Sequence, residues 1–391
     1  MIGVRRGTAR ASRLVAALLL AGSLAACGNG GYHQAGPWEP LPEGAPPNVG
    51  PPTNSPPVPA PAPGQPADPG SGPQPQDPNV VASGLNVPTG LVVLPDGTAI
   101  VGERETGRLL QVFPDRSPAR ELMTLPGIDT SGDGGLLGLA LSPTYAQDGL
   151  LYAYVSTATD NRVVRFPIGG APNPVLQGLP RGQTHNGGAM VFGADGTLFI
   201  GTGDTGNPAL AADPASLAGK VLHVDVFGHP IGAGPVYARG LADVSALCLS
   251  GGGTMYATDD SAGGTDELDA ITEGGDYGSP AGRSGIIDPV VTYPDAQGGP
   301  GGCAAADSTV FIGLLEGHKI SIAAFDGQGH RTTAPQAFLA DKYGRLRTIV
   351  LDAQGGLWIT TSNRDGLGTP AADDDKVLRI VPPTSSGHSP L

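Results

Sequence analysis

The 391-residue chain is poor in charge, in aromatic side chains and in cysteine. Charged residues make up 15% of it, aromatic residues 5%, and cysteine occurs three times, which allows one intramolecular disulfide at most. Basic residues are scarce, because 22 lysines and arginines face 36 acids and the net charge is −14. This balance excludes nucleic acid as an expected partner. Helical periodicity of any length is nearly absent, which excludes a helical architecture and favours an all-β fold.

The N-terminus has the order of an export signal. Arginines at positions 5, 6, 10 and 13 precede an apolar run over residues 14–26, and Cys27 follows directly. The run is short for a membrane span and ends in small residues, which favours a cleaved signal. The ending "LAAC" resembles a bacterial lipobox, so residues 1–26 would be removed and acylated Cys27 would anchor the protein on the outer face of the bacterial cell membrane. An ordinary secretory signal is the alternative.

Composition divides the rest of the chain into three parts. Residues 27–79 are dominated by proline, glycine, alanine and serine and cannot build a core, so they are expected to form an extended, proline-rich linker. Residues 80–382 are expected to form one large all-β domain, and residues 383–391 a flexible tail. Without its signal the chain would be still more acidic, so acidic lipid would repel it except at the acyl anchor.

Six similar strand–turn–strand units recur along residues 80–382. Each has an apolar strand, an Asp-Gly or Gly-rich turn suited to positive φ, and a second alternating strand. The units begin at Gly90, Leu139, Ala189, Ala246, Asp307 (a looser copy) and Thr348. Spacings of roughly 45 to 60 residues predict a six-bladed β-propeller of four-stranded antiparallel blades, with ligands bound in an axial funnel. A β-sandwich is the alternative, but its strands would lack this long period.

Cys248 and Cys303 remain after the lipobox cysteine and would be exported to an oxidising compartment. A disulfide between them would close a loop of about 55 residues and contribute roughly 4 kcal/mol in the chain-entropy model. Two buried free thiols are the alternative.

Several motifs, in order, carry a resemblance to a known family. They are "GERETGRLLQV", "GDGGLLGLALSPTY", "HNGGAMVFGADGTLFIGTGD", "NPALAADPASLAGKVLHVD", "DELDAITEGGDYGSP" and "GRLRTIVLDAQGGLWITTSNRDG". Over about residues 81–382 the chain resembles the soluble quinoprotein glucose/sorbosone dehydrogenases. The lipobox, the linker and "LSPTYAQDGLLYAYVSTATDNRV" also resemble a subgroup of mycobacterial-type lipoproteins.

The resemblance implies a funnel that holds pyrroloquinoline quinone (PQQ) on a calcium ion. His185 falls on the family's catalytic histidine, which removes a proton from a sugar hydroxyl as hydride passes to the quinone. Arg345 and Arg347 fall on two arginines that face the cofactor, and Asp133 replaces a family glutamine; these three are assigned to cofactor binding. Asp204 is expected to be a turn or blade-edge acid rather than a partner of His185.

The resemblance also implies two sets of calcium ligands. The carbonyls of Ser261 and Ala262 would bind the cofactor's calcium, and Glu267, the Tyr277 carbonyl and Asp288 a second, structural ion. The alternative is that Asp266, Glu267 and Asp269 simply solvate an exposed turn. The "DDDK" sequence of residues 373–376 is expected to be a solvated loop.

Other positions depart from the family pattern. Thr184 replaces an acid, Ala242 and Asp243 replace an Arg-Asn pair, and a lysine is lost at Leu315 or Glu316, although Arg239 or Lys319 would offer a substitute cation. Three functions therefore stay open: a membrane-anchored sugar dehydrogenase using PQQ and calcium, a non-catalytic propeller that binds a cell-envelope ligand or protein, and a calcium-dependent lactonase-type hydrolase. The propeller is expected to be monomeric.

Overall fold

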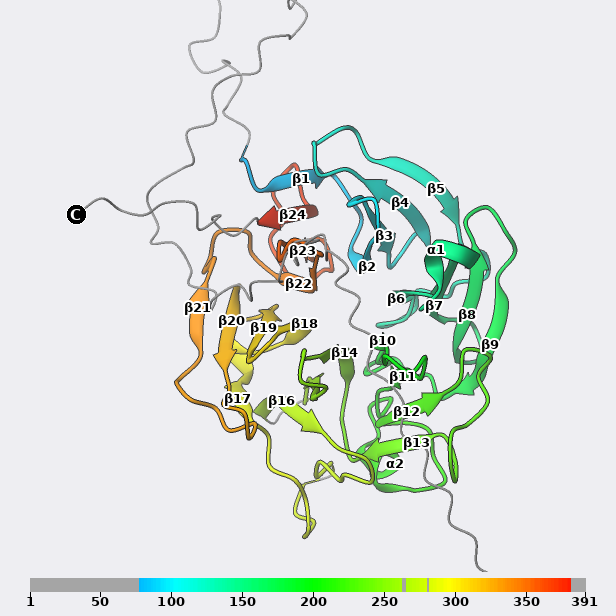
Figure 1. Cartoon of the computed structure of the whole chain (residues 1–391), viewed down its shortest axis with the longest axis vertical. Coiled ribbons are helices and arrows are strands. Elements are labelled where there is room, and N and C mark those ends of the chain that lie inside the picture. Colours follow the sequence, from blue (N-terminus) through cyan, green and yellow to red (C-terminus); the bar gives the residue numbers. More distant parts are fainter. Residues whose placement is uncertain (1–76, 262–264, 280, 381–391) are drawn as a thin grey trace, which may run out of the picture. The chain divides into compact units, whose positions relative to one another are not determined.

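The computed structural model describes residues 77–261, 265–279 and 281–380. Six four-stranded antiparallel sheets are arranged around a central axis (Figure 1), which confirms the six-bladed β-propeller. The signal, Cys27, the linker up to residue 76, Ala262 and the tail from residue 381 lie outside the described residues. Within the described part, no helical segment has the length and apolar character that a membrane-spanning helix requires.

The first three blades follow one another along the chain. Blade 1 contains β2 (Pro88–Val93), β3 (Ala99–Glu103), β4 (Arg108–Val112) and β5 (Arg120–Thr124). Blade 2 contains β6 (Leu136–Leu141), β7 (Leu150–Ser156), β8 (Asn161–Pro167) and β9 (Asn173–Leu179). Blade 3 contains β10 (Met190–Phe192), β11 (Leu198–Gly201), β12 (Lys220–Val224) and β13 (Val236–Arg239). The short helices α1 (Tyr145–Asp148) and α2 (Pro208–Ala212) lie in connections within blades 2 and 3.

The last three blades complete the ring. Blade 4 contains β14 (Val244–Leu249), β15 (Met255–Asp259), β16 (Thr265–Ile271) and β17 (Val291–Pro294). Blade 5 contains β18 (Pro300–Ala306), β19 (Thr309–Leu314), β20 (Lys319–Ala324) and β21 (Gln336–Phe338). Blade 6 contains β22 (Leu346–Leu351), β23 (Leu357–Thr361), β24 (Lys376–Ile380) and the N-terminal strand β1 (Val80–Ser83).

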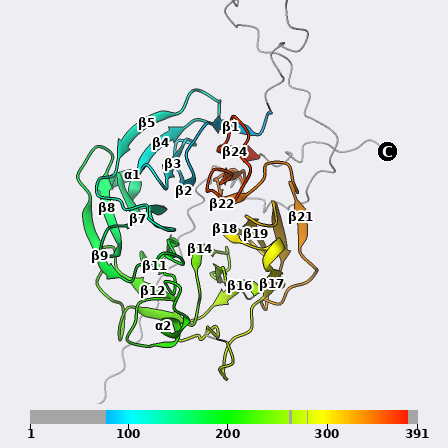
Figure 2. The ribbon, with the colours of Figure 1, turned by 180° about the vertical axis from the view of Figure 1, so that it is seen from behind.

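Blade 6 closes the ring by joining the two ends of the domain. β1 pairs antiparallel with β24, and Val80 lies opposite Leu378 (Figure 1, blue beside red). The same pairing is seen from behind in Figure 2. A closed ring leaves no blade without a neighbour, so the apolar faces of every sheet are buried against another sheet.

The hydrophobic core lies between adjacent blades rather than inside any one of them. One cluster joins blades 1 and 2 through Ile100, Leu136 and Phe166, all at most 1% exposed. The inner strands also approach closely: a Cβ at Gly138 would lie 2.1 Å from the Gly188 carbonyl oxygen, so only glycine fits there. The inner strand of blade 2 is therefore in close contact with the segment that leads into the inner strand of blade 3.

A disulfide joins the inner strands of blades 4 and 5. Cys248 on β14 and Cys303 on β18 are bonded, with 5.8 Å between their Cα atoms. The predicted pairing is therefore confirmed, and it links two blades whose cysteines are 55 residues apart in sequence.

Candidate functional site

An axial cavity of about 470 Å³ runs between the six innermost strands. Each blade contributes to its lining, for example through Thr89, Leu137, Gly187, Ser245, Gly301 and Arg347. The segments that precede the inner strands of blades 2, 3, 4 and 6 carry Asp133, His185, Asp243 and Arg345. The propeller thus gathers chemically active side chains at one end of its axis, as the repeat predicted.

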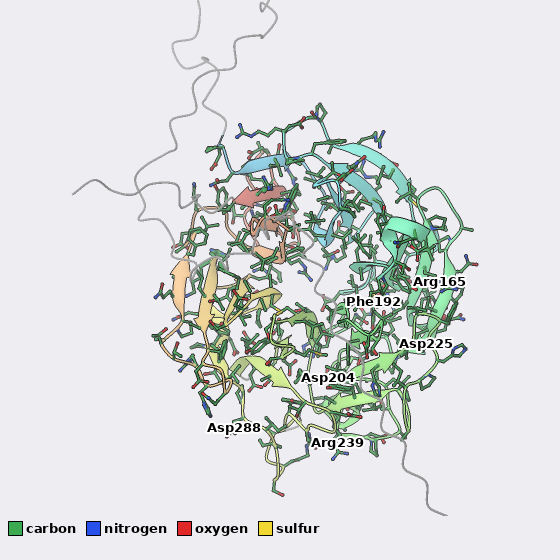
Figure 3. The ribbon with its side chains drawn as sticks, viewed as in Figure 1. Arg165, Phe192, Asp204, Asp225, Arg239 and Asp288 are labelled. Atoms are coloured by element: carbon green, nitrogen blue, oxygen red, sulfur yellow. A yellow bond between two sulfur atoms is a disulfide. The ribbon has the colours of Figure 1, made fainter. Side chains whose placement is uncertain are left out.

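His185 is paired with a buried carboxylate. Its Nδ1 lies 2.8 Å from Oδ1 of Asp204, whose side chain is 1% exposed. Figure 3 shows Asp204 on blade 3, closer to the axis than Arg239. The prediction that Asp204 would be a mere turn acid is therefore wrong: besides accepting the N–H of Gly206, it accepts a hydrogen bond from the histidine ring. Because Nδ1–H donates to Asp204, Nε2 is left as the ring nitrogen available for proton transfer.

The loop of His185 approaches the following strand very closely. A Cβ at Gly203 would lie 1.9 Å from the His185 carbonyl oxygen, so no side chain fits at that position. His185 itself has a φ of 53°, a backbone conformation uncommon for residues other than glycine. The "GTGD" sequence therefore supplies both the space for the loop and the carboxylate that orients the ring.

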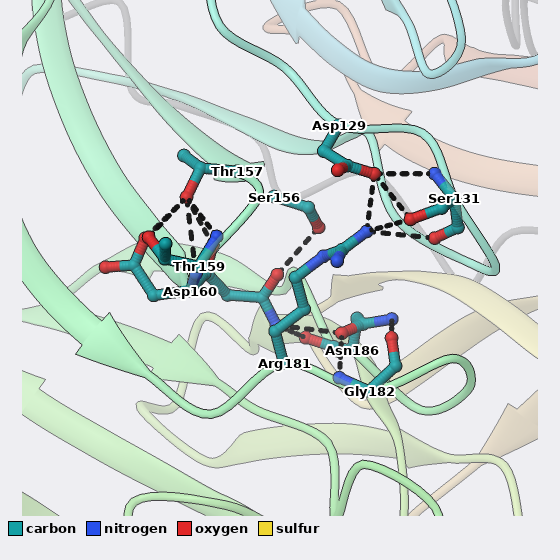
Figure 4. A network of polar contacts seen from close by, with 10 residues as sticks. Asp129, Ser131, Ser156, Thr157, Thr159, Asp160, Arg181, Gly182 and Asn186 are labelled. Atoms are coloured by element: carbon teal, nitrogen blue, oxygen red, sulfur yellow. Dashed lines mark hydrogen bonds and ion pairs between the residues drawn. The ribbon is translucent and has the colours of Figure 1, made fainter.

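A polar network holds this loop from the blade 2 side (Figure 4). Arg181 donates to Oδ1 of Asp129 and to Oγ of Ser131, both at 2.7 Å. Asn186 exchanges two hydrogen bonds of 3.0 Å with the backbone of Gly182 and accepts one of 2.9 Å from Asn161. These contacts were not found from the sequence, since they join residues up to 52 positions apart. They preorganise the loop that presents His185.

Nearby acids set the charge of His185. The hydrogen bond to Asp204 and the negative charges of Asp243, Asp204 and Asp260 raise the pKa of His185 to about 9, against the opposing effect of burial. Burial raises the pKa of Asp243 to about 6 and that of Asp260 to about 7. The ring is therefore cationic at neutral pH and loses its proton only in alkaline solution.

Asp243 is part of the His185 loop as well as of its field. Its Oδ1 accepts the N–H of Gly187 at 2.7 Å, two residues after the histidine. Thr184, where the family has an acid, lies in the same loop. The carboxylate near the His185 ring therefore comes from Asp243, at the start of blade 4, and not from the residue before His185.

The two predicted arginines differ in their partners. Arg345 is 5% exposed and is bonded to Asp365 (Nε to Oδ2, 2.9 Å) and to Glu316 (Nη1 to Oε1, 3.0 Å). Arg347 lines the axial cavity and makes no hydrogen bond or ion pair with any residue that the structure describes. Burial, and then the charge of Arg104, lowers the pKa of Arg347. Arg347 therefore presents to the cavity a guanidinium group whose N–H donors have no partner among the described residues.

The remaining cofactor candidates are arranged less simply. Asp133 is exposed in the loop beside His185, where its N–H donates to the Gln183 carbonyl at 2.9 Å. Arg239 donates to Asp276 at 3.0 Å, and Lys319 is on β20, the third strand of blade 5. Neither lines the axial cavity, so the two proposed substitute cations are not found there.

An acidic triad lies in blade 4, on strands β15 and β16. Ligand atoms of Asp259, Glu267 and Asp269 all lie within 4.8 Å of one another. Asp266 and Asp269 are 3% and 0% exposed on β16, so the interpretation of these acids as an exposed, solvated turn is wrong. Asp259 was not singled out from the sequence, because its pairing with Glu267 depends on the register of β15 and β16.

Of the predicted metal ligands, Glu267 belongs to this triad. Burial, and then the charges of Asp266 and Asp288, raises the pKa of Glu267 to about 6, while Asp288 itself is exposed on its loop (Figure 3). Tyr277 is buried and its hydroxyl donates to the Ala270 carbonyl at 2.8 Å. Ser261 donates its N–H to Asp266 at 3.1 Å.

The "DDDK" sequence is also more buried than predicted. Asp374 and Asp375 are 3% and 0% exposed. Asp375 accepts the N–H groups of Val87 and Asn363 at 3.2 and 2.5 Å. The solvated-loop prediction is wrong for these two residues, because the carboxylate joins the β23–β24 connection to the first blade.

Comparison with known proteins places these features in a wider group. The profile of the Glucose / Sorbosone dehydrogenase family matches residues 85–298. Quinoprotein glucose dehydrogenase B of Acinetobacter calcoaceticus is 26% identical over 251 residues, 52% of each chain, so this chain spans about half the length of that relative. The aldose sugar dehydrogenase YliI of Escherichia coli is 22% identical over 73% of this chain and 90% of its own.

Two solved structures share both the fold and a substantial part of the sequence. The PQQ-bound aldose sugar dehydrogenase of Streptomyces coelicolor has a TM-score of 0.74 and 38% identity, covering 77% of this chain and 96% of its own. A putative oxidoreductase (glucose dehydrogenase) of Thermus thermophilus has a TM-score of 0.71 and 33% identity, covering 77% and 98%.

Proposed function

The chain belongs to the glucose/sorbosone dehydrogenase family, and we propose that it oxidises an aldose or a related sugar with PQQ and calcium. The observation that carries the proposal is the pairing of two groups at one end of the axial cavity. His185, oriented by Asp204, offers a ring nitrogen for proton transfer, and Arg347 offers a guanidinium without a partner among the described residues. A relative that is 38% identical is known in a PQQ-bound form.

The donor set of the cavity fits the carboxylates of PQQ. Arg347 has its forked N–H groups free, the arrangement that binds a carboxylate through two parallel hydrogen bonds. Arg345, two residues before it, adds positive charge, although Glu316 and Asp365 offset part of it. The carbonyl of Ser261 and that of residue 262 would bind the calcium of the cofactor, as the family resemblance implies.

The cofactor, when bound, supplies the hydride acceptor. The chain itself would handle the proton: Nε2 of His185 would accept it from the hydroxyl of the sugar carbon that is oxidised. Asp204 would keep the other proton on Nδ1 and stabilise the imidazolium that results. The Asn186 and Arg181 network would keep the ring in place during this transfer.

A second candidate is a non-catalytic propeller that binds a cell-envelope ligand or protein. It is favoured by the acids of the site, since Asp243 and Asp260 act on His185 and Glu316 neutralises part of Arg345. Negative charge near the cofactor's carboxylates would weaken its binding by Coulomb repulsion. The proposal and this alternative therefore differ in one measurable quantity, the affinity for PQQ.

Location is the second part of the proposal. The sequence order of arginines, apolar run and Cys27 supports export, cleavage and lipid anchoring on the outer face of the membrane, with residues 27–79 as a linker. The propeller would then work as a monomer on a membrane-attached linker. Mass spectrometry of the purified protein tests this: an N-terminal diacyl-cysteine at position 27 supports the proposal, and an unmodified N-terminus contradicts it.

Titration of the full chain in detergent with PQQ and calcium tests the proposed reaction. Saturable one-to-one binding by calorimetry, followed by reduction of the bound cofactor when an aldose is added, is the expected result. Arg347→Ala should weaken the binding, whereas Arg116→Ala, a change at an exposed arginine of the β4–β5 connection, should not. Absence of binding at about 100 μM PQQ means a Kd weaker than roughly 10⁻⁴ M and would favour the non-catalytic propeller.

A further inference from the structure

The acidic triad of blade 4 contains one carboxylate, that of Asp269, whose charge nothing in the described structure offsets. Asp269 is 0% exposed, and neither of its side-chain oxygens has a hydrogen-bond partner among the described residues. Asp259 is 3% exposed and Glu267 is half-buried. No lysine, arginine or histidine of the described chain forms an ion pair with any of the three. Burying several carboxylates together without a cation is strongly unfavourable.

The geometry brings the three side chains onto one face of blade 4. Asp259 lies opposite Glu267 in the β15–β16 ladder, and Ala257 lies opposite Asp269. Since alternate residues of a strand share a face, the three carboxylates point the same way as Ala257 and Ile271, which pack against Leu241 and Val221 of the blade 3 side. The triad therefore lies in the interface between blades 3 and 4.

We propose that Asp259, Glu267 and Asp269 hold a structural calcium ion in this interface, and that the ion fixes the segment carrying Asp243 beside His185. Three carboxylates offer up to six oxygen donors, which suits the six to eight oxygen ligands of calcium. Magnesium retains several waters and fits a largely dry site less well. Glu267, the least buried of the three, leaves a path for the ion to enter.

This ligand set differs from the structural calcium that the family resemblance implies. That set combines Glu267 with the Tyr277 carbonyl and with Asp288, which is exposed. The triad instead uses Asp259 and Asp269, and Asp269 is the residue whose buried oxygens have no described partner. The two sets share only Glu267, so substitutions at Asp269 and Asp288 distinguish them.

A short chain of contacts links the triad to the histidine loop. Asp259 accepts the N–H of Ala242 at 2.9 Å and that of Asp243 at 2.6 Å. The side chain of Asp243 then accepts the N–H of Gly187, two residues from His185. An ion that holds Asp259 in place would therefore also hold the Ala242–Asp243 backbone and, through it, the His185 loop.

Calcium binding to the full chain, measured without PQQ or sugar, tests the site independently of the proposed enzymatic activity. After removal of metal with a chelator, one calcium per chain should bind by calorimetry and raise Tm by roughly 5 °C at saturating concentration. Asp269→Asn should weaken the affinity at least tenfold and abolish the Tm shift. Asp288→Asn, the matched control, should change the affinity less than threefold.

Three results would overturn the site. The first is the absence of calcium binding in the wild type together with a higher Tm for Asp269→Asn, which would mean that the buried acids share protons instead. The second is loss of the ion in Asp288→Asn but not in Asp269→Asn, which would assign it to the other ligand set. The third is an unaffected affinity in both variants.

Nuclear magnetic resonance of the histidine rings tests the link to the active loop. The chain has seven histidines, so selective labelling and a His185→Gln variant allow the His185 signal to be assigned. Calcium should shift this signal in the wild type and leave it unchanged in Asp269→Asn. A bound ion that does not move the His185 signal would refute the positioning role while leaving the metal site intact.

Discussion

The side chains near the starts of the inner strands form two unlike groups around the axis, called here the acidic wall (blades 3 and 4) and the basic wall (blade 6). On the side of blades 3 and 4, His185 is hydrogen-bonded to Asp204, and the charges of Asp243 and Asp260 act on its ring. On the side of blade 6, Arg345 and Arg347 follow one another at the start of the inner strand. One wall is therefore organised to handle a proton, and the other to hold an anion.

The two walls also differ in how their charges are offset. Asp204 is almost fully buried and accepts hydrogen bonds from the His185 ring and from the Gly206 N–H. Asp243 accepts the N–H of Gly187, so both carboxylates of the acidic wall have hydrogen-bond donors. On the basic wall, Arg345 is bonded to two acids, whereas Arg347 has no bonded partner among the residues described. Of these two arginines, Arg347 is therefore the one available to an external ligand.

Of the changes considered, removal of His185 should have the largest effect on the reaction rate, because His185 is the group that Asp204 orients for proton transfer. His185→Gln should lower kcat about 10²- to 10⁴-fold, the usual contribution of a general base, with a smaller change in KM. Steady-state oxidation of an aldose by the PQQ-loaded protein measures this. A loss of less than tenfold would show that the proton is taken by another group.

The acidic wall should also impose an alkaline pH profile. A base must be unprotonated to act, and a pKa of about 9 leaves only about 1% of His185 neutral at pH 7. The value of kcat/KM should therefore rise roughly 50-fold between pH 7 and 9 and level off above the pKa. In Asp204→Asn, which removes the largest cause of the raised pKa, the rise should move to lower pH. An unchanged midpoint in that variant would contradict the assignment.

The basic wall should lose cofactor affinity when its free guanidinium is removed. Arg347→Ala should weaken PQQ binding about 10- to 100-fold, since a charge-assisted hydrogen bond contributes about 1.5–3 kcal/mol. Arg345→Ala should act mainly on stability, because it leaves Asp365, with a side chain 5% exposed, without its cation. Calorimetric titration and thermal unfolding of both variants separate the two effects; equal losses of affinity would mean that the two arginines act alike.

The fold was predictable because blade hairpins have a local signature. Asp-Gly or Gly-rich turns between apolar strands identified the first two strands of most blades, and the last unit gave β22 and β23. Blade 5 was read out of phase: the unit from Asp307 covers β19 and β20, while its inner strand β18, "PGGCAAA", was missed. Glycine and alanine have weak strand propensity, so this strand is defined by its neighbours rather than by its own residues.

The site was less predictable, because its contacts depend on long-range register. His185 and the arginines could be placed through family motifs, but the role of Asp204 depends on the close passage of Gly203 past the His185 carbonyl. The acids of "DELDA" suggested an exposed turn, since nothing in the sequence reveals that β16 is packed between two blades. Burial of a charged side chain depends on tertiary packing, whereas composition alone predicts that an acidic side chain is exposed.

The smallest expected effect would come from making the two walls more alike. Asp243→Asn keeps an oxygen that can accept the Gly187 N–H, so the loop should be retained, but it removes one of the negative charges that raise the pKa of His185. We expect the apparent pKa of kcat/KM to fall by less than one unit and PQQ affinity to rise about two- to fivefold. Both changes follow from the loss of one charge–charge interaction, which contributes on the order of 1 kcal/mol where water screens the charges. The same titration and pH profile measure both quantities. If Asp243→Asn instead lost affinity, the carboxylate would be a ligand of the bound state, and the acidic wall would hold the cofactor as well as the proton.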